Sequence, residues 1–187
     1  RFGRCRGDKC LGNRAGDTVV GGSARFPRAG GEFMTTTVSF EDVMLDGAKE
    51  VFASMVSMPM ERLADPTSQK DDAMFLATIT FTGDVEGCFG ISCSCECAKA
   101  VAAGMLCMED SSALSDSETI DAIGEIANMI MGGVKTRIQH EITIIEISIP
   151  SVVYGRQLQN RLGEGMIRVA IPVTIGKQYQ AELSLVH

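Results

Sequence analysis

Residues 121–135 read DAIGEIANMIMGGVK, a stretch in which apolar residues recur with the period of an α-helix. At 3.6 residues per turn, one face of this helix carries a carboxylate, Glu125, and a carboxamide, Asn128, one turn apart. The opposite face is apolar and consists of Ile123, Ile126, Ala127, Ile130 and Val134. The stretch therefore predicts a half-buried helix that presents a small polar pair to a partner.

The sequence also indicates where this helix starts and ends. Ser115-Asp116-Ser117-Glu118 has the spacing of a capping box, in which the serine hydroxyl accepts from a first-turn N–H and the glutamate reaches back to the serine N–H. Towards the C-terminus, the helical pattern continues past Gly132 and Gly133 to about Gln139. We expect one long helix between these points.

Other elements follow from the same kind of pattern. Helical spacing predicts helices over residues 40–56, which Pro59 stops, and 97–108. Alternating patterns predict strands, two of them joined at Gly83-Asp84 and two across Gly176-Lys177. The order predicts a two-layer α/β domain of the α+β type, with helices packed on a mostly antiparallel sheet. The expected strands span residues 74–82, 85–92, 142–149, 166–175 and 179–186.

A weak internal repeat relates the two halves of the chain. Shifted by 75 positions, the segment that starts at Asp46 matches the one that starts at Asp121 in its apolar pattern, and Glu50 aligns with Glu125. The repeat predicts a pseudo-twofold domain. Asn128 aligns with Ala53 in the first copy, so a site built on the Glu-x-x-Asn pair would occur once.

The first 33 residues differ in character from the rest. They hold 8 of the 20 glycines and 7 basic against 3 acidic residues, and they show no sustained apolar period. Glu32-Phe33 directly before Met34 is also what an EcoRI cloning site encodes in translation. We expect residues 1–33 to be a vector-derived or disordered leader and residues 34–187 to form one folded domain, since a chain of this size with 45% hydrophobic residues buries a sizeable core.

Without the leader, the chain is strongly acidic. Of its 17 basic and 24 acidic residues, 10 and 21 fall in residues 34–187, which gives a formal net charge of −11. Such a surface disfavours nucleic acid and anionic membranes as partners. The sequence has no apolar run long enough for a signal peptide or a membrane span, so we expect a cytoplasmic protein.

The helical stretch resembles the active-site helix of the CheC/CheX/FliY family of chemotaxis phosphatases, whose signature reads Gly-Glu-Ile/Leu-x-Asn-Met-Ile followed by Gly. Here the signature runs from Gly124 to Ile130, with Gly132 and Gly133 after it. A second likeness is the run IPSVVYG at residues 149–155, which is similar to a run that follows a strand in CheX-like members. The resemblance spans roughly residues 40–186 and is greatest to the CheX-like members.

The resemblance implies a CheC-like fold of two related halves and a phosphatase that hydrolyses the aspartyl phosphate of a CheY-like response regulator. It implies that Asn128 orients the attacking water and that Glu125 pairs with the regulator's active-site lysine. Further partner-binding residues would be Gly124 and Gly132, which allow close approach of a backbone, together with Lys135 and Asp121. The Mg²⁺ ion would come with the regulator, this chain would need no cofactor or metal of its own, and a homodimer is expected.

Elementary chemistry agrees with these roles. Hydrolysis of an aspartyl phosphate needs a water aligned behind phosphorus and neutralisation of the phosphoryl oxygens, and it needs little covalent help from the protein. A carboxamide can hold a water by hydrogen bonds without the negative charge that would repel phosphate.

Other interpretations remain open at this level. Glu-x-x-Asn occurs often by chance on exposed helix faces, and a non-enzymatic adaptor that binds receiver domains or flagellar switch proteins is the main alternative. Cys93, Cys95 and Cys97 suggest a zinc site or a redox sensor, but no histidine lies near them in the sequence, which favours a buried thiol cluster. With His140 and His187 as the only histidines, nucleophilic catalysis by a Ser/His or Cys/His pair has little support.

Overall fold

The computed structural model describes residues 25–27, 33–35, 39–64, 73–156, 158 and 167–187. The helical elements of these residues are α1 (Phe40–Val51), the π-helical turn η1 (Phe52–Val56), α2 (Cys95–Met105), the 3-10 turn η2 (Ser111–Ala113) and α3 (Asp116–Ile138). The strands are β1 (Arg25–Pro27), β2 (Phe33–Thr35), β3 (Met60–Arg62), β4 (Ala73–Gly83), β5 (Gly87–Ser94), β6 (Ile145–Ile147), β7 (Ser151–Arg156), β8 (Arg168–Ile175) and β9 (Tyr179–Val186).

Most of the expected leader, residues 1–33, lies outside the described residues. β1 lies within the leader and pairs antiparallel with β2, which crosses its predicted end, and the two strands form a small sheet separate from the main one. The boundary at Met34 therefore stays a prediction.

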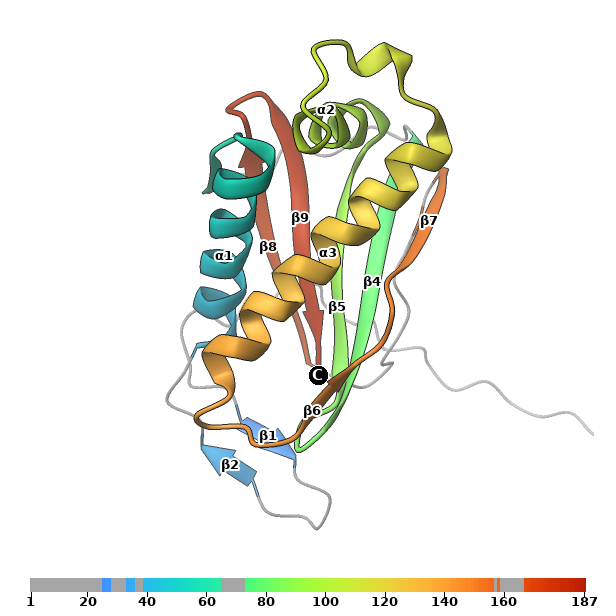
Figure 1. Ribbon diagram of the computed structural model, residues 1–187. Coiled ribbons are helices and arrows are strands. Elements are labelled where there is room, and N and C mark those ends of the chain that lie inside the picture. Colours follow the sequence, from blue (N-terminus) through green and yellow to red (C-terminus); the bar gives the residue numbers. More distant parts are fainter. Residues whose placement is uncertain (1–24, 28–32, 36–38, 65–72, 157, 159–166) are drawn as a thin grey trace, which may run out of the picture.

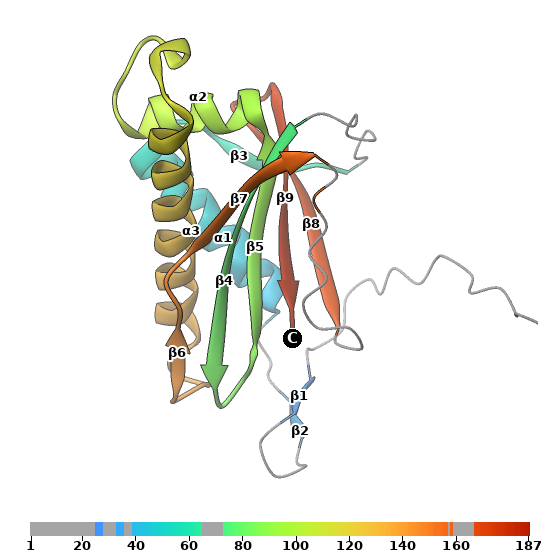
Figure 2. The same cartoon turned by 90° about the vertical axis from the view of Figure 1, so that its right-hand side faces the viewer.

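The main sheet has the strand order β3-β8-β9-β5-β4-β6, and β7 also pairs with β4. Every pairing in it is antiparallel. Figures 1 and 2 show α1 and α3 packed on one face of this sheet, with α2 across its upper end. The structure thus confirms the predicted two-layer architecture of helices on an antiparallel sheet.

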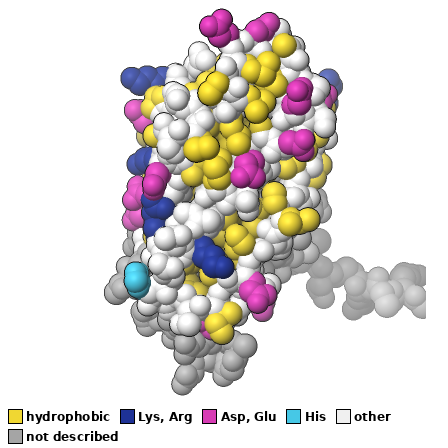
Figure 3. Space-filling view, in the orientation of Figure 1, with side chains coloured by type: hydrophobic (Ala, Val, Ile, Leu, Met, Phe, Trp, Pro, Cys, Tyr) yellow, Lys and Arg dark blue, Asp and Glu magenta, His cyan; other side chains and the backbone are white. Residues whose placement is uncertain are grey.

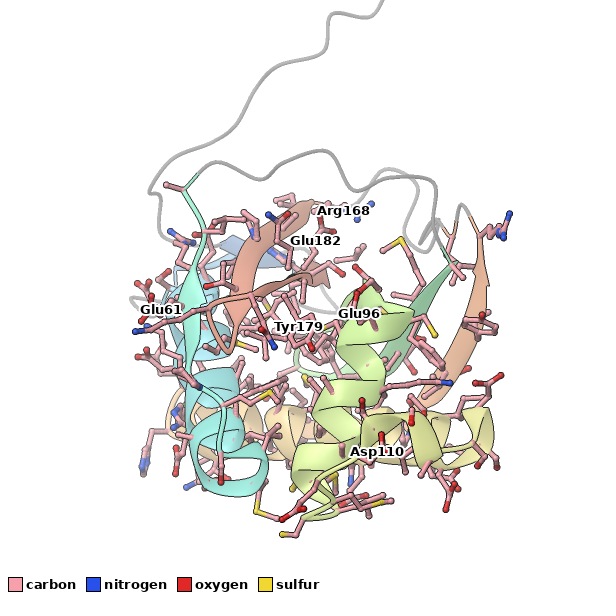
Figure 4. All side chains as sticks on the ribbon, turned by 90° about the horizontal axis from the view of Figure 1, so that it is seen from above. Glu61, Glu96, Asp110, Arg168, Tyr179 and Glu182 are labelled. Carbon is pink, nitrogen blue, oxygen red and sulfur yellow. The ribbon has the colours of Figure 1, made fainter. Side chains whose placement is uncertain are left out.

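The core lies between the helices and the sheet. Strand side chains alternate, so Phe75, Ile79 and Phe89 point to the helices and are fully buried. The other face of the sheet is more polar. It carries the ion pair between Arg168 and Glu182 (3.1 Å), which Figure 4 shows on the side away from α3. No helix of the described residues combines the length and the apolar character needed to cross a bilayer.

The sheet confirms the internal repeat. If β3 is exchanged with β6, β4 with β8, and β5 with β9, the strand order reads the same from the other end. α1 precedes the first set of strands and α3 the second. The first strand of each half pairs with the other half at the edge of the sheet: β3 pairs with β8, and β6 pairs with β4. α2 has no counterpart among the described elements. The domain is therefore pseudo-twofold, with its axis between β5 and β9.

The geometry corrects the alignment of the two copies. A twofold axis that exchanges two helices passes through their crossing, so residues at the crossing correspond. There Gly47 packs against the Ile130 carbonyl and the Val134 side chain, 83 and 87 positions further along. The strands require a large shift as well, since β5 and β9 begin 92 positions apart, at Gly87 and Tyr179. The shift of 75, which aligned Glu50 with Glu125, is therefore wrong.

Some boundaries also differ from the prediction. α2 begins at Cys95 instead of residue 97, because the Ser94 hydroxyl accepts a hydrogen bond from Cys97 N (3.2 Å) and caps the helix there. The strand expected over 142–149 is limited to β6, and the later run IPSVVYG contains a second strand, β7. The three-residue β3 was not predicted.

The turn at Gly83-Asp84 explains why β6 begins late. Gly83 has a φ of +132°, and a Cβ there would lie 2.3 Å from the Ile144 carbonyl oxygen, so only glycine fits. The Asp84 carboxylate accepts hydrogen bonds from the N–H groups of Thr143 (3.1 Å) and Ile144 (3.0 Å). These bonds hold residues 143 and 144 as a loop.

Candidate active site

The helix that carries the candidate site is fixed at its N-terminus by the predicted capping box. The Ser115 hydroxyl accepts from Glu118 N (3.2 Å), and the Glu118 carboxylate accepts from Ser115 N (2.9 Å). These hydrogen bonds hold the pKa of the Glu118 carboxyl below its usual range. α3 then runs to Ile138, one residue before the predicted end.

Packing against the sheet and α1 sets the rotation of α3. The predicted apolar face is buried: Ile126, Ala127 and Ile130 are inaccessible to solvent, and Ile123 and Val134 nearly so. The predicted site residues other than Gly124 therefore lie on one outward stripe of the helix, spaced by three or four positions. Asp121, Glu125 and Lys135 are exposed on it, and Asn128 and Gly132 are half-buried.

The polar side chains of this stripe have no partners within the described residues, where neither Glu125 nor Asn128 forms an ion pair or a side-chain hydrogen bond. Other acidic residues of the same helix are engaged. Asp116 pairs with Lys99 (3.4 Å), and Glu118 belongs to the capping box. The site pair is thus available to a second molecule.

Gly124 does not belong to the surface that a partner would touch, which corrects the prediction. It is buried, and a Cβ there would lie 3.3 Å from the Val152 side chain and 3.6 Å from the Pro150 ring. Its small size allows close packing of α3 against the segment that leads into β7. The run at residues 149–155 was recognisable in the sequence, but only the tertiary structure shows that this run packs on Gly124.

Gly132 is the opposite case. A Cβ added to Gly132 would meet no atom within 4 Å. Packing within the described residues therefore gives no reason for a glycine there, although glycine costs about 1 kcal/mol relative to alanine inside a helix. This openness is compatible with close approach of a partner backbone.

The cysteines of the β5–α2 junction are structural in character. Cys93 and Cys97 are buried, and Cys95 is half-buried. A hydrogen bond with the Cys97 thiol, together with burial, raises the pKa of Cys93 well above its usual value. A buried neutral thiol is a poor nucleophile and a poor metal ligand. Within the described ranges, no group of three or more His, Cys, Asp or Glu side chains has the geometry of a metal site.

The outward stripe of α3 carries two exposed carboxylates, Asp121 and Glu125, and an exposed lysine, Lys135. Two carboxylates without ion-pair partners in the described residues, those of Asp121 and Glu125, attract cationic groups of a second molecule. Figure 3 shows acidic and basic side chains both on this face, with hydrophobic side chains between them. The arrangement suits a partner surface that contributes positive charge next to the stripe.

Comparison with known proteins agrees with this description. Residues 75–174, which include all of α3, match the family described as chemotaxis phosphatase CheX. The CheY-P phosphatase CheX of Thermotoga maritima is 29% identical over 110 residues, which cover 59% of this chain and 70% of that protein.

Solved structures show the same fold. The chemotaxis protein CheX from Desulfovibrio desulfuricans superposes with a TM-score of 0.66 at 20% identity and covers 80% of this chain and 100% of its own. A CheX–CheY–BeF3–Mg²⁺ complex from Borrelia burgdorferi gives a TM-score of 0.61 at 21% identity, with 80% and 97% covered.

Proposed function

The chain belongs to the CheX family of chemotaxis phosphatases, and we propose that it hydrolyses the aspartyl phosphate of a CheY-like response regulator with Asn128 and Glu125 of α3. The observation that carries the proposal is the stripe itself: a carboxylate and a carboxamide one turn apart, exposed or half-exposed, with no partner in the described part of the chain. The proposal places the protein in two-component signalling in the cytoplasm.

In this reaction a water oxygen attacks phosphorus, the bond between phosphorus and the aspartate oxygen breaks, and the products are inorganic phosphate and a free carboxylate. Asn128 acts on the water. Its side-chain oxygen accepts a hydrogen bond from that water and holds it in line with the breaking bond. Because the carboxamide is uncharged, it does this next to an anionic phosphoryl group without electrostatic cost.

Glu125 acts on the partner. Placed one turn before Asn128 on the same stripe, its carboxylate pairs with a lysine of the regulator's active site and fixes the register of the helix against the phosphoryl group. This pairing also removes the isolated charge that would otherwise oppose phosphate. Lys135, three turns further along the helix, adds attraction for an acidic regulator surface.

The metal of the reaction belongs to the substrate. The complex from Borrelia burgdorferi contains CheY, BeF3 and Mg²⁺ in its described composition. We propose that the Mg²⁺ bound by the phosphorylated regulator neutralises its phosphoryl oxygens here as well, with no cofactor bound by this chain. Gly132 leaves room for the regulator's backbone.

The test is the decay of a phosphorylated CheY-like regulator, followed by release of inorganic phosphate with and without this protein. A catalytic amount should accelerate the decay many-fold, and removal of Mg²⁺ should abolish the effect. If the protein binds the regulator tightly but leaves its decay unchanged, the adaptor function takes the place of the phosphatase.

We also propose a homodimer. β3 pairs with residues 173–175 of β8, and Leu63 N donates to the Pro172 carbonyl, so the first half of β8 offers a free edge for strand pairing in the described part of the sheet. Light scattering of the purified protein should give twice the mass of one chain, and a monomer at micromolar concentration would refute this part of the proposal.

A further inference from the structure

The strand pair beside the site contains a β-bulge. Phe81 pairs with Ile147, and Thr78 pairs with Ser151. Two residues of β4 therefore lie opposite three residues of the other strand, 148–150. One extra residue in an antiparallel strand bends the chain and re-aims a side chain.

Hydrogen bonds hold the bulge in a defined shape. Ser148 N donates to the Thr80 carbonyl (2.9 Å), and Thr80 N donates to the Ser148 hydroxyl (3.1 Å), which replaces the missing backbone acceptor. The same hydroxyl donates to the Ile149 carbonyl (2.9 Å). Pro150 then restricts the next backbone angle. The conformation at Ile149 is therefore well determined.

This conformation pushes Ile149 into solvent. Its relative exposure is 87%, against 58% for Ile167, the next most exposed large hydrophobic side chain of the described residues. An isolated exposed isoleucine needs no explanation in general, but here a hydrogen-bonded bulge presents it, and the chain could have placed a polar residue there at no cost to packing.

The bulge lies directly beside the site. Pro150 packs on Gly124, which precedes Glu125 in the helix. Figure 3 shows hydrophobic side chains at the surface next to α3, where the chain passes from β6 to β7 in Figure 1. The residue that follows Ile149 thus packs on the helix turn that carries Glu125.

We propose that Ile149 is an apolar anchor for the phosphorylated receiver domain. The Ile149 side chain enters a hydrophobic pocket of that domain, next to the phosphoaspartate. The inference rests on the proposed function and adds a specificity determinant to it. The ion pair of Glu125 would form with the active site of any phosphorylated receiver. The Ile149 side chain would favour those receivers that have a matching hydrophobic pocket. Burial of a side chain at the edge of a polar site is a common source of binding energy.

The test uses Ile149→Ala, with Ile167→Ala as the matched control. Ile167 is also an exposed isoleucine, but it precedes β8, and β9, β5 and β4 separate that strand from the bulge. Binding is measured to a CheY-like receiver domain loaded with beryllium fluoride and Mg²⁺, and turnover is measured on the phosphorylated receiver. We expect Ile149→Ala to weaken binding and raise KM about tenfold, with kcat and Tm unchanged, and Ile167→Ala to behave as wild type.

Three results would overturn the proposed anchor. The Ile149→Ala variant could bind the receiver as tightly as wild type does, or it could lower kcat with unchanged affinity. The Ile167→Ala variant could weaken binding as much as Ile149→Ala does. Wild-type protein that does not accelerate dephosphorylation at all refutes the proposed function itself. An active wild type with an unaffected Ile149→Ala refutes only the anchor.

Discussion

α1 and α3 are equivalent helices of the two halves, but they use their acidic side chains differently. On α1, Glu41 pairs with Arg62 (2.6 Å), Asp46 lies 3.9 Å from Lys49, and Glu50 pairs with Arg137 of α3. On α3, the carboxylates of the outward stripe have no ion-pair partner in the described residues. Three carboxylates of α1 thus take part in ion pairs within the domain, whereas those on the stripe of α3 are available for the partner that we propose.

The corrected alignment explains why the proposed Glu-x-x-Asn site occurs on α3 and not on α1. With a shift of 83–87, the counterpart of Glu125 falls near Phe40 and that of Asn128 near Val43. Phe40 is only 4% exposed and lies at the first turn of α1. α1 thus begins at the position that corresponds to the turn of α3 with Glu125 and Asn128. It also lies outside residues 75–174, which match the family.

Among substitutions on the two helices, Asn128→Ala should have the largest effect on turnover. We expect kcat to fall by about 10² or more, because a well-placed polar group that acts in the transition state is lost. Affinity for the receiver loaded with beryllium fluoride should change little. The measurement is single-turnover decay of the phosphorylated regulator, and wild-type decay with this variant would exclude the water-orienting role.

Glu125→Ala should have the next largest effect. Loss of an interfacial charge pair weakens ground-state and transition-state binding together, so we expect affinity and kcat/KM to fall by about tenfold in parallel. Glu125→Gln, of the same size, separates charge from shape. If affinity stayed at the wild-type level while kcat fell, Glu125 would act on the chemistry instead of the partner.

The N-terminal caps of α3 and α1 should contribute differently to the free energy of unfolding. Ser115→Ala removes half of a capping box and should lower the free energy of unfolding by about 1 kcal/mol. Ser39→Ala, at the start of α1, removes one long hydrogen bond from Asp42 N (3.4 Å) and should cost less. Urea denaturation of both variants compares the helices, and an equal loss would show that the second half of the box contributes nothing.

The same cap predicts a pH dependence. The pKa of Glu118 is depressed in the folded chain by its hydrogen bonds to Ser115. Its stabilisation is therefore present above the unfolded pKa and is lost as the pH falls through the lower, folded pKa. Glu118→Ala should be less stable than wild type at neutral pH, and the two curves should converge in the acid range.

The smallest effect should come from Glu50→Ala. The carboxylate of Glu50 is 68% exposed and pairs with Arg137, and exposed ion pairs contribute about 0.5 kcal/mol or less. Activity should equal that of wild type. A large loss of turnover would mean that α1 takes part in the reaction, and the contrast between the helices would disappear.

Local pattern was sufficient for much of this protein. The period of residues 121–135 identified the buried face of α3, and the spacing of Ser115 and Glu118 identified its start. Gly83-Asp84 and Gly176-Lys177 identified two hairpin turns. These features are set by residues within a few positions of each other, through helix geometry, capping and allowed backbone angles. The outward position of Glu125 and Asn128 follows from the same period.

Only the tertiary structure decided the rest. The burial of Gly124, the bulge that exposes Ile149, the short β3 and the true shift between the halves all depend on which strand or helix lies opposite. Cross-strand register is a property of two distant segments, and a single extra residue changes which side chains face the core. The sequence by itself determined the helix that carries the proposed site, and the packing around that helix decided which neighbouring residues are exposed beside it.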